Sequence, residues 1–197
     1  MTMAVVAATL EPATAPARRP LRGEADDVLA QRFERALRAR DGYAGAHCVH
    51  EQWMRGALEA NIERALVRLW ERAAESIPDW LPMRHIDWLP LAYEVAGRFR
   101  RGTGGHSHVY LVLLDYRDSR DEPYGVYVGM SRYLPAQRFD QHKAGIRAAG
   151  SVLRRGLEVL TGPVLHLRHL ARAEAAGIEE NLAAALRAAG IFVQGGH

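Results

Sequence analysis

The sequence predicts an α+β fold, in which helices flank a small sheet and a helical region precedes it. Three observations carry this prediction. Apolar residues recur at helical spacing in the first hundred residues, a Gly-rich segment at 102–105 interrupts the chain, and strand-like and helix-like segments alternate after it. The length of 197 residues suffices for one or two domains with a substantial core.

The N-terminal half is predicted to consist of a tail followed by a helical domain over residues 24–101. Residues 1–23 are rich in Ala, Pro and Thr, which is typical of a disordered tail. A first helix is expected after Gly23, and a longer one from about Glu51 to Ser76, beyond the break at Asp41-Gly42. The apolar face of the first helix would consist of Leu29, Phe33, Ala36 and Leu37.

The C-terminal half, residues 106–197, mixes strands and helices. VYLVLL at 109–114 is apolar, aromatic and β-branched, as expected for a buried strand. The predicted elements are strands over 109–114 and 125–128, helices over 135–145 and 148–160, a strand over 164–170, a helix over 173–189 and a strand over 191–193.

The net charge of +3 lies entirely in the second half of the chain. Residues 1–100 carry 14 basic and 14 acidic side chains, whereas residues 101–197 carry 12 and 9. One stretch holds six basic residues and a single acid, Asp140, which indicates a surface for a polyanion or merely a solvated basic face. Its basic residues are Arg132, Arg138, Lys143, Arg147, Arg154 and Arg155.

Composition also excludes several classes of protein. The lone Cys48 excludes a disulfide framework and a cysteine-based zinc site. The longest apolar run near the start, MAVVAATL, is too short to span a bilayer and has no basic residues before it. We therefore expect a cytoplasmic protein with no membrane partner.

Five side chains in the second half could meet. Tyr110 and Tyr127 would share one face if their strands form a hairpin, and Arg138 and His142 are one turn apart on the next helix. Glu179 belongs to the last helix. Phosphodiester cleavage needs a base for water, a cation for the phosphate and a carboxylate for a divalent metal, and this set contains all three.

The order of these residues resembles the GIY-YIG nuclease superfamily. The similarity lies in Val109-Tyr110, in YVG at 127–129, in RFDQH at 138–142 and in E-x-x-L at 179–182, and it covers about residues 106–197. The closing GIFVQGGH also resembles a bacterial subgroup of that superfamily. The resemblance implies a central three-stranded antiparallel sheet with a metal-dependent endonuclease site on its face.

The resemblance also implies a role for each residue. Tyr110 and Tyr127 would be the first- and second-motif tyrosines, one of which, most often the second, helps to deprotonate the attacking water. His142 would tune that phenol or relay its proton, and Arg138 would bind the scissile phosphate. Glu179 would be the one protein ligand of Mg²⁺ or Mn²⁺.

The sequence thus predicts a metal-dependent endonuclease that hydrolyses DNA, either duplex or single-stranded. We expect Arg132, Lys143, Arg147, Arg154 and Arg155 to contact the nucleic acid. The helical domain could set target choice, bind a protein partner, form a homodimer or pack against the catalytic sheet. The alternatives are a non-catalytic nucleic-acid-binding or protein-interaction module on the same fold, and a nuclease for RNA or single strands.

Overall fold

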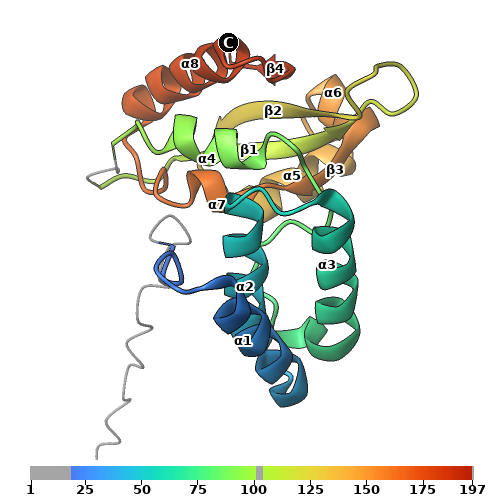
Figure 1. Cartoon of the computed structure of the whole chain (residues 1–197). Coiled ribbons are helices and arrows are strands. Elements are labelled where there is room, and N and C mark those ends of the chain that lie inside the picture. Colours follow the sequence, from blue (N-terminus) through green and yellow to red (C-terminus); the bar gives the residue numbers. More distant parts are fainter. Residues whose placement is uncertain (1–18, 101–103, 197) are drawn as a thin grey trace, which may run out of the picture.

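The computed structural model describes residues 19–100 and 104–196 and has the predicted α+β class. Three helices form one end of the molecule and a four-stranded sheet with further helices forms the other (Figure 1). Of the predicted tail, residues 1–18 lie outside the described residues. The boundary expected at residues 102–105 falls partly outside them as well, and the division into domains stays a prediction.

The N-terminal helices are α1 (Asp26–Ala39), α2 (Gly42–Met54) and α3 (Glu59–Ala73), followed by the short 3₁₀ helix η2 (Ala74–Ser76). The predicted face of α1 is confirmed, because Leu29, Phe33, Ala36 and Leu37 are its buried residues. Asp41 is the N-cap of α2, since its side chain accepts a hydrogen bond from the backbone N–H of Ala44 at 2.9 Å.

The single long helix expected from Glu51 to Ser76 is wrong, because this region contains the end of α2 and the whole of α3. Gly56 adopts φ +77, a left-handed conformation that ends a helix. The Arg55 guanidinium bonds to the Glu51 and Asp26 side chains and to carbonyls of the 21–24 segment. The apolar spacing continues across this break, so periodicity alone did not reveal it.

Two long strands, β1 (His108–Asp115) and β2 (Tyr124–Ser131), form the antiparallel hairpin that the sequence predicts. β1 lies inside the sheet, whose strand order is β3-β1-β2-β4, and it is buried along nearly its whole length. A strand covered on both faces needs apolar residues at every position, which accounts for the uninterrupted VYLVLL run.

The sheet is not the expected three-stranded antiparallel one. β3 (Gly156–Val159) pairs antiparallel with β1, but β4 (Val193–Gly195) adds a fourth strand parallel to β2. The terminal strand predicted at 191–193 therefore begins two residues later and joins the main sheet.

The expected strand over 164–170 is also wrong, and the helix expected over 148–160 is shorter. The chain instead forms α6 (Gly150–Arg155), then β3, then the short helix α7 (Thr161–Val164). Val164, Leu167 and Leu170 are all buried, a spacing of three that a strand of period two cannot produce. The segment runs beside the start of β1, where the Leu167 carbonyl accepts from the Val109 N–H at 3.0 Å.

Helices cover both faces of the sheet (Figure 1). α4 (Leu89–Ala96), α7 and α8 (Arg172–Ala188) pack with one face in the main hydrophobic core. α5 (Pro135–Lys143) and α6 lie against the other face, over a smaller apolar cluster that includes Tyr110, Val112 and Leu114. α5 and α8 agree closely with the helices predicted over 135–145 and 173–189. No helix in the described part of the chain is long and apolar enough to span a membrane.

Candidate active site

The two tyrosines lie on the same face of the β1–β2 hairpin. Tyr127 is opposite Val112, and Tyr110 is two residues from Val112 on the same strand, so both phenols point the same way. Their ring centroids are 6.1 Å apart. Gly129 lies opposite Tyr110, and a Cβ there would be 2.6 Å from the Tyr127 ring and 2.7 Å from the Tyr110 hydroxyl. This glycine provides the space in which the two phenols meet.

His142 of α5 is buried beside Tyr110, and its hydrogen bonds fix its tautomer. The backbone N–H of Ala149 donates to His142 Nδ1 at 2.9 Å, so Nδ1 carries the lone pair and Nε2 carries the proton. Nε2 therefore donates to the Tyr110 hydroxyl oxygen, 2.9 Å away. Burial, with the Arg138 charge as a second cause, lowers the pKa of His142 to about 4, so the ring is neutral near pH 7.

Tyr127 lies next to the Tyr110 end of this hydrogen-bonded group, with the two ring centroids 6.1 Å apart. Burial raises the pKa of both phenols. The interaction between the two phenols raises the pKa of Tyr110 and lowers that of Tyr127, which opposes the effect of burial at Tyr127. The Ala149 N–H, His142 and Tyr110 thus form one hydrogen-bonded chain, and Tyr127 is the phenol beside its end.

Arg138 lies next to this chain but also holds the loop after α5. Its guanidinium donates to the Gln141 side chain at 3.1 Å and to the carbonyls of Ile146 and Arg147 at 3.2 and 2.8 Å. It also acts on the phenols, because its positive charge lowers the pKa of both tyrosines. One side chain therefore connects the phenols with the loop at 144–149.

Glu179 of α8 is the acidic member of the group and acts electrostatically on Tyr127. It is half-buried, burial raises the pKa of its carboxyl, and its charge raises the pKa of Tyr127. Within residues 19–100 and 104–196 no side chain forms a hydrogen bond or ion pair with this carboxylate. A half-buried carboxylate without a counter-charge fits a cation as its partner.

The C-terminal glycines bring β4 close to Tyr127 and α8. Gly195 has φ +80, and a Cβ there would collide with the Val128 carbonyl and lie 2.8 Å from the Tyr127 ring. Gly196 has φ +76 and lies against Ala183 of α8. Only glycine permits both the left-handed backbone and this close approach.

The structure therefore brings together Tyr110, Tyr127, Arg138, His142 and Glu179, which come from four separate segments of the sequence. Sequence reasoning missed the Ala149 N–H, which has no side-chain signal. It also gave no spatial role to Gly129 and Gly195, although the YVG and QGG patterns contain them.

The predicted nucleic-acid contacts divide into two groups. Arg132, Arg147 and Arg154 are exposed. Lys143 instead donates to the carbonyls of Leu153 and Gly156, each at 3.2 Å. Arg155 pairs with Asp118 at 2.6 Å and lies over the Tyr116 ring at 4.6 Å. These last two cations help to hold α6 and the adjoining loops in place.

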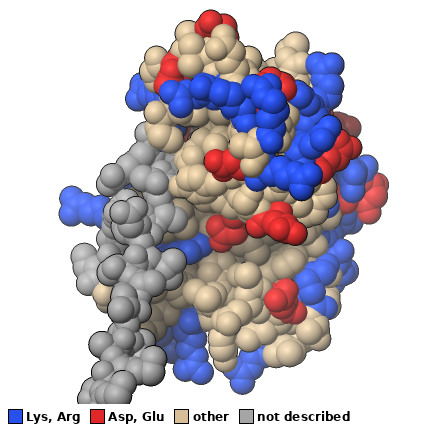
Figure 2. Space-filling view, turned by 90° about the horizontal axis from the view of Figure 1, so that it is seen from below, with Lys and Arg blue, Asp and Glu red and all other residues tan. Residues whose placement is uncertain are grey.

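The helical end of the molecule has mixed charge. Viewed from that end, basic and acidic side chains are interspersed, and the most continuous band of basic side chains crosses the upper part of the view (Figure 2). This agrees with the equal numbers of basic and acidic residues in the first hundred positions.

The comparisons with known proteins identify no relative. Searches against protein-family models, curated proteins and solved structures found no match to this chain. The resemblance to the GIY-YIG superfamily therefore stays a hypothesis that rests on the motifs and on the grouping of their side chains.

Proposed function

We propose that this chain is a metal-dependent endonuclease that hydrolyses phosphodiester bonds in DNA. The observation that carries the proposal is the meeting of two phenols, a neutral imidazole, a guanidinium and an unpaired carboxylate at the β1–β2 hairpin. Each belongs to a motif whose order along the chain resembles that nuclease superfamily. Together they supply the groups that phosphodiester hydrolysis requires.

In this proposal Tyr127 first loses its hydroxyl proton to solvent and then, as a phenolate, accepts a proton from the attacking water. Burial raises the pKa of Tyr127, whereas its interactions with Tyr110 and Arg138 lower it and so favour the phenolate. His142 holds Tyr110 in place through Nε2–H, and the Ala149 N–H keeps that tautomer. In this proposal His142 positions Tyr110. It does not accept the proton of the attacking water, because its Nδ1 lone pair already accepts a hydrogen bond from the Ala149 N–H.

Arg138 would bind the phosphate while it retains its contacts to the loop. A guanidinium has five N–H donors. Three of them serve Gln141, Ile146 and Arg147, which leaves two donors for phosphate oxygens. Its charge would stabilise the negative charge that develops on the phosphate.

Glu179 would hold Mg²⁺ or Mn²⁺, with water and phosphate oxygens as the other ligands. When bound, such an ion would supply Lewis-acid chemistry, the stabilisation of negative charge at the phosphate. The Glu179 charge is one cause of the raised pKa of Tyr127. Neutralising that charge would therefore bring the pKa of this phenol closer to its ordinary value, and Tyr127 would give up its proton more easily.

A single site of this kind cuts one strand, so cleavage of both strands would need a second copy of the chain or two successive nicks. An exposed apolar patch on α3 supports a partner on the helical side. Val67 and Trp70 are 54% and 56% exposed, and with Leu66 and Met83 they line a groove of about 390 Å³.

The decisive experiment is a cleavage assay on supercoiled plasmid and on labelled single- and double-stranded oligonucleotides. It compares Mg²⁺, Mn²⁺ and EDTA for the wild type and for Glu179→Ala. We expect metal-dependent cutting by the wild type, no cutting by Glu179→Ala, and similar DNA binding by both. RNA oligonucleotides in the same assay test the alternative substrate.

The matched control is Glu180→Ala, which removes an exposed carboxylate from the next position of α8 and should cut normally. Equal cutting by the wild type and Glu179→Ala would overturn the proposed site. Salt-dependent DNA binding without cutting on any substrate would overturn the nuclease and favour the non-catalytic binding module.

A further inference from the structure

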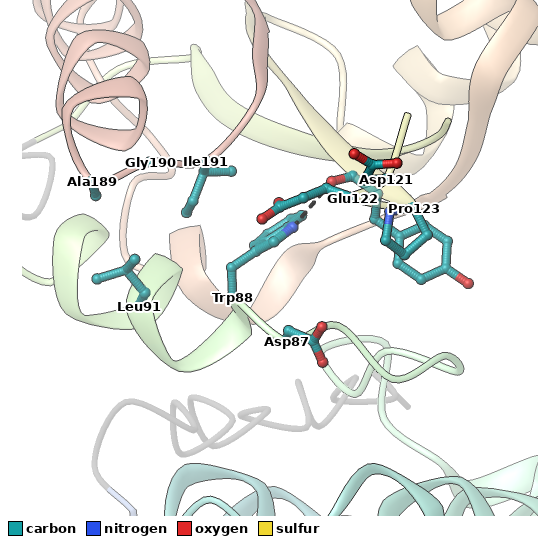
Figure 3. Close-up of a pocket in the computed structure, with 10 residues that line it drawn as sticks. Asp87, Trp88, Leu91, Asp121, Glu122, Pro123, Ala189, Gly190 and Ile191 are labelled. Carbon is teal, nitrogen blue, oxygen red and sulfur yellow. Dashed lines mark hydrogen bonds between the residues drawn. The ribbon is translucent and has the colours of Figure 1, made fainter. Parts of the chain in front are cut away.

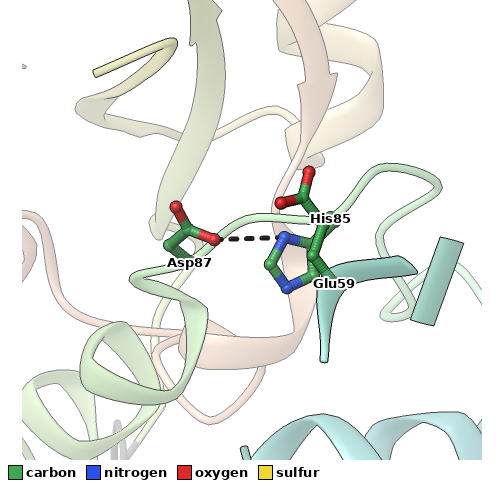
Figure 4. Close-up of side chains that lie close together, drawn as sticks. All are labelled: Glu59, His85 and Asp87. Carbon is green, nitrogen blue, oxygen red and sulfur yellow. Dashed lines mark ion pairs between the residues drawn. The ribbon is translucent and has the colours of Figure 1, made fainter. Parts of the chain in front are cut away.

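A second group of metal-ligating side chains lies far along the sequence from Glu179. Glu59 begins α3, and His85 and Asp87 belong to the loop that precedes α4. One ligand atom from each lies within 4.8 Å of the others. Figure 4 shows the carboxylates of Glu59 and Asp87 turned towards the imidazole of His85. His85 Nδ1 is 3.1 Å from the nearer Asp87 oxygen.

The His85 ring is held in one orientation by its surroundings. It stacks on Trp53 of α2 with ring centroids 5.4 Å apart and an angle of 13° between the planes. The Trp53 indole N–H donates to the Ile86 carbonyl at 3.3 Å, and the His85 backbone N–H donates to the Glu63 carboxylate at 2.6 Å. The side chain of His85 is only 10% exposed, so its position does not depend on a ligand.

Among the described residues, the two carboxylates differ from many other acids in their lack of a Lys or Arg partner. In the described part of the chain, no Lys or Arg forms an ion pair with Glu59 or Asp87. Many other acids on this Arg-rich chain, such as Glu34, Glu94 and Asp115, do have an Arg partner. Two carboxylates without a Lys or Arg partner, beside an oriented imidazole, leave a local negative charge that a bound cation would offset.

The site is open to solvent on the side of Asp87. This residue also lines a cavity of about 380 Å³, together with Trp88, Asp121 and Glu122. Figure 3 shows the cavity between Trp88, the 121–123 loop and the segment just after α8, Ala189–Ile191. A metal ion could therefore enter without a rearrangement of the core and complete its coordination with water.

We propose that Glu59, His85 and Asp87 form a binding site for a divalent transition metal, with Zn²⁺ as the best match. Imidazole nitrogen with two carboxylate oxygens suits Zn²⁺, Co²⁺ or Mn²⁺, whereas Mg²⁺ prefers a shell of oxygen atoms alone. Three protein donors leave one tetrahedral position for water. The bound ion would join the start of α3 to the loop before α4.

This site is independent of the proposed nuclease centre and of its metal. It shares no residue with Tyr110, Tyr127, Arg138, His142 or Glu179. Its expected effect is on stability, because an ion that binds the folded chain and not the unfolded one raises the melting temperature. The test therefore needs no cleavage measurement.

The experiment uses the full chain after treatment with EDTA and its removal. Thermal unfolding is followed with added Zn²⁺ or Mg²⁺, and the absorption spectrum is recorded with Co²⁺. We expect saturating Zn²⁺, at about 100 times its dissociation constant, to raise the Tm by roughly 5–10 °C, with little effect of Mg²⁺. Co²⁺ should give visible absorption bands with a stoichiometry of one ion per chain.

Asp87→Asn and Glu59→Gln test the ligands at exposed positions, where the change should not prevent folding. Both variants should lose most of the Zn²⁺ response. Glu71→Gln on the exposed surface of α3 is the matched control, and Glu179→Ala shows independence from the other metal; both should respond as the wild type does. No Zn²⁺ response in the wild type, or an equal response in Asp87→Asn, would overturn the proposal.

Discussion

Successive residues of β1 alternate between two faces of the sheet that are built differently. One face belongs to the main hydrophobic core under α4, α7 and α8, and carries Val109, Leu111 and Leu113. The other belongs to a smaller cluster under α5 and α6, and carries Tyr110, Val112 and Leu114. The first face contributes chiefly to stability, whereas the second keeps polar groups buried and hydrogen-bonded at one end of the strand. A uniformly apolar strand thus serves both packing and the candidate site.

The largest expected effect comes from the polar face. Tyr127→Phe retains the ring and removes the hydroxyl, so it should lower the cleavage rate by about 10²- to 10⁴-fold, the usual contribution of general acid–base catalysis. Stability should change little, because the ring is half-buried and keeps its packing. Single-turnover cleavage and urea unfolding measure the two quantities. If Tyr127→Phe lowered the free energy of unfolding by as much as it raised the activation free energy of cleavage, the two faces would not differ in role.

On the apolar face, truncation should affect folding and leave the chemistry alone. Leu111 is fully buried in the main core, so Leu111→Ala should lower the free energy of unfolding by about 2–5 kcal/mol. Urea unfolding of Leu111→Ala checks this value, with Val67→Ala at an exposed position as the control. At a temperature where the variant is folded, cleavage per folded molecule should equal that of the wild type. If folded Leu111→Ala cut DNA more slowly than the folded wild type, the assignment of this face to stability alone would be wrong.

The same comparison explains which parts of the fold the sequence could predict. The hairpin, α5 and α8 were predictable because their patterns are long and their ends carry turn or capping residues, as at Pro135. β3 and β4 have four and three residues. Their pairing depends on which neighbours the rest of the fold presents, so local pattern did not reveal it. The left-handed Gly56 that separates α2 from α3 gave too weak a signal against continuous apolar spacing.

For the candidate site, the side chains were predictable and their connections were not. Motif order named all five residues, but it did not show that a backbone N–H of Ala149 fixes the tautomer of His142. Nor did it show that Arg138 binds carbonyls of its own loop. Both contacts involve backbone atoms, which every residue possesses, so the residue types alone carry no sign of them.

A smaller effect is expected where β4 passes the polar face. Gly195→Ala places a Cβ against the Val128 carbonyl and the Tyr127 ring at a left-handed φ, so it should destabilise the fold by more than about 1 kcal/mol and slow cleavage. Gly177→Ala is the matched control. Gly177 is a helical position in α8 with nothing within 4 Å of the added Cβ, and the change should stabilise by about 0.5–1 kcal/mol. Urea unfolding should therefore show a lower free energy of unfolding for Gly195→Ala and a higher one for Gly177→Ala. A change of the same sign in both variants would contradict the role given to Gly195.

The smallest effect concerns pH and again separates the two faces. The pKa of His142 is lowered to about 4 in the folded chain, against about 6.5 for an unfolded one. Between these values the unfolded chain binds a proton at this ring and the folded chain does not, so the free energy of unfolding falls as the pH falls. From pH 7 to pH 5.5 this loss should be about 1 kcal/mol for His142.

Urea unfolding at the two pH values measures this loss, and His142→Gln should show a correspondingly smaller one. His50 is a second buried histidine for comparison, and it contacts Trp80 and Tyr93 on the side of the main core. Burial lowers its pKa to about 4 as well. His50→Gln should reduce the pH dependence of stability while cleavage at pH 7 stays normal. His142→Gln should reduce both, because the Tyr110 hydroxyl then loses the donor that holds it. Normal cleavage by His142→Gln would show that the buried imidazole of the polar face serves packing alone.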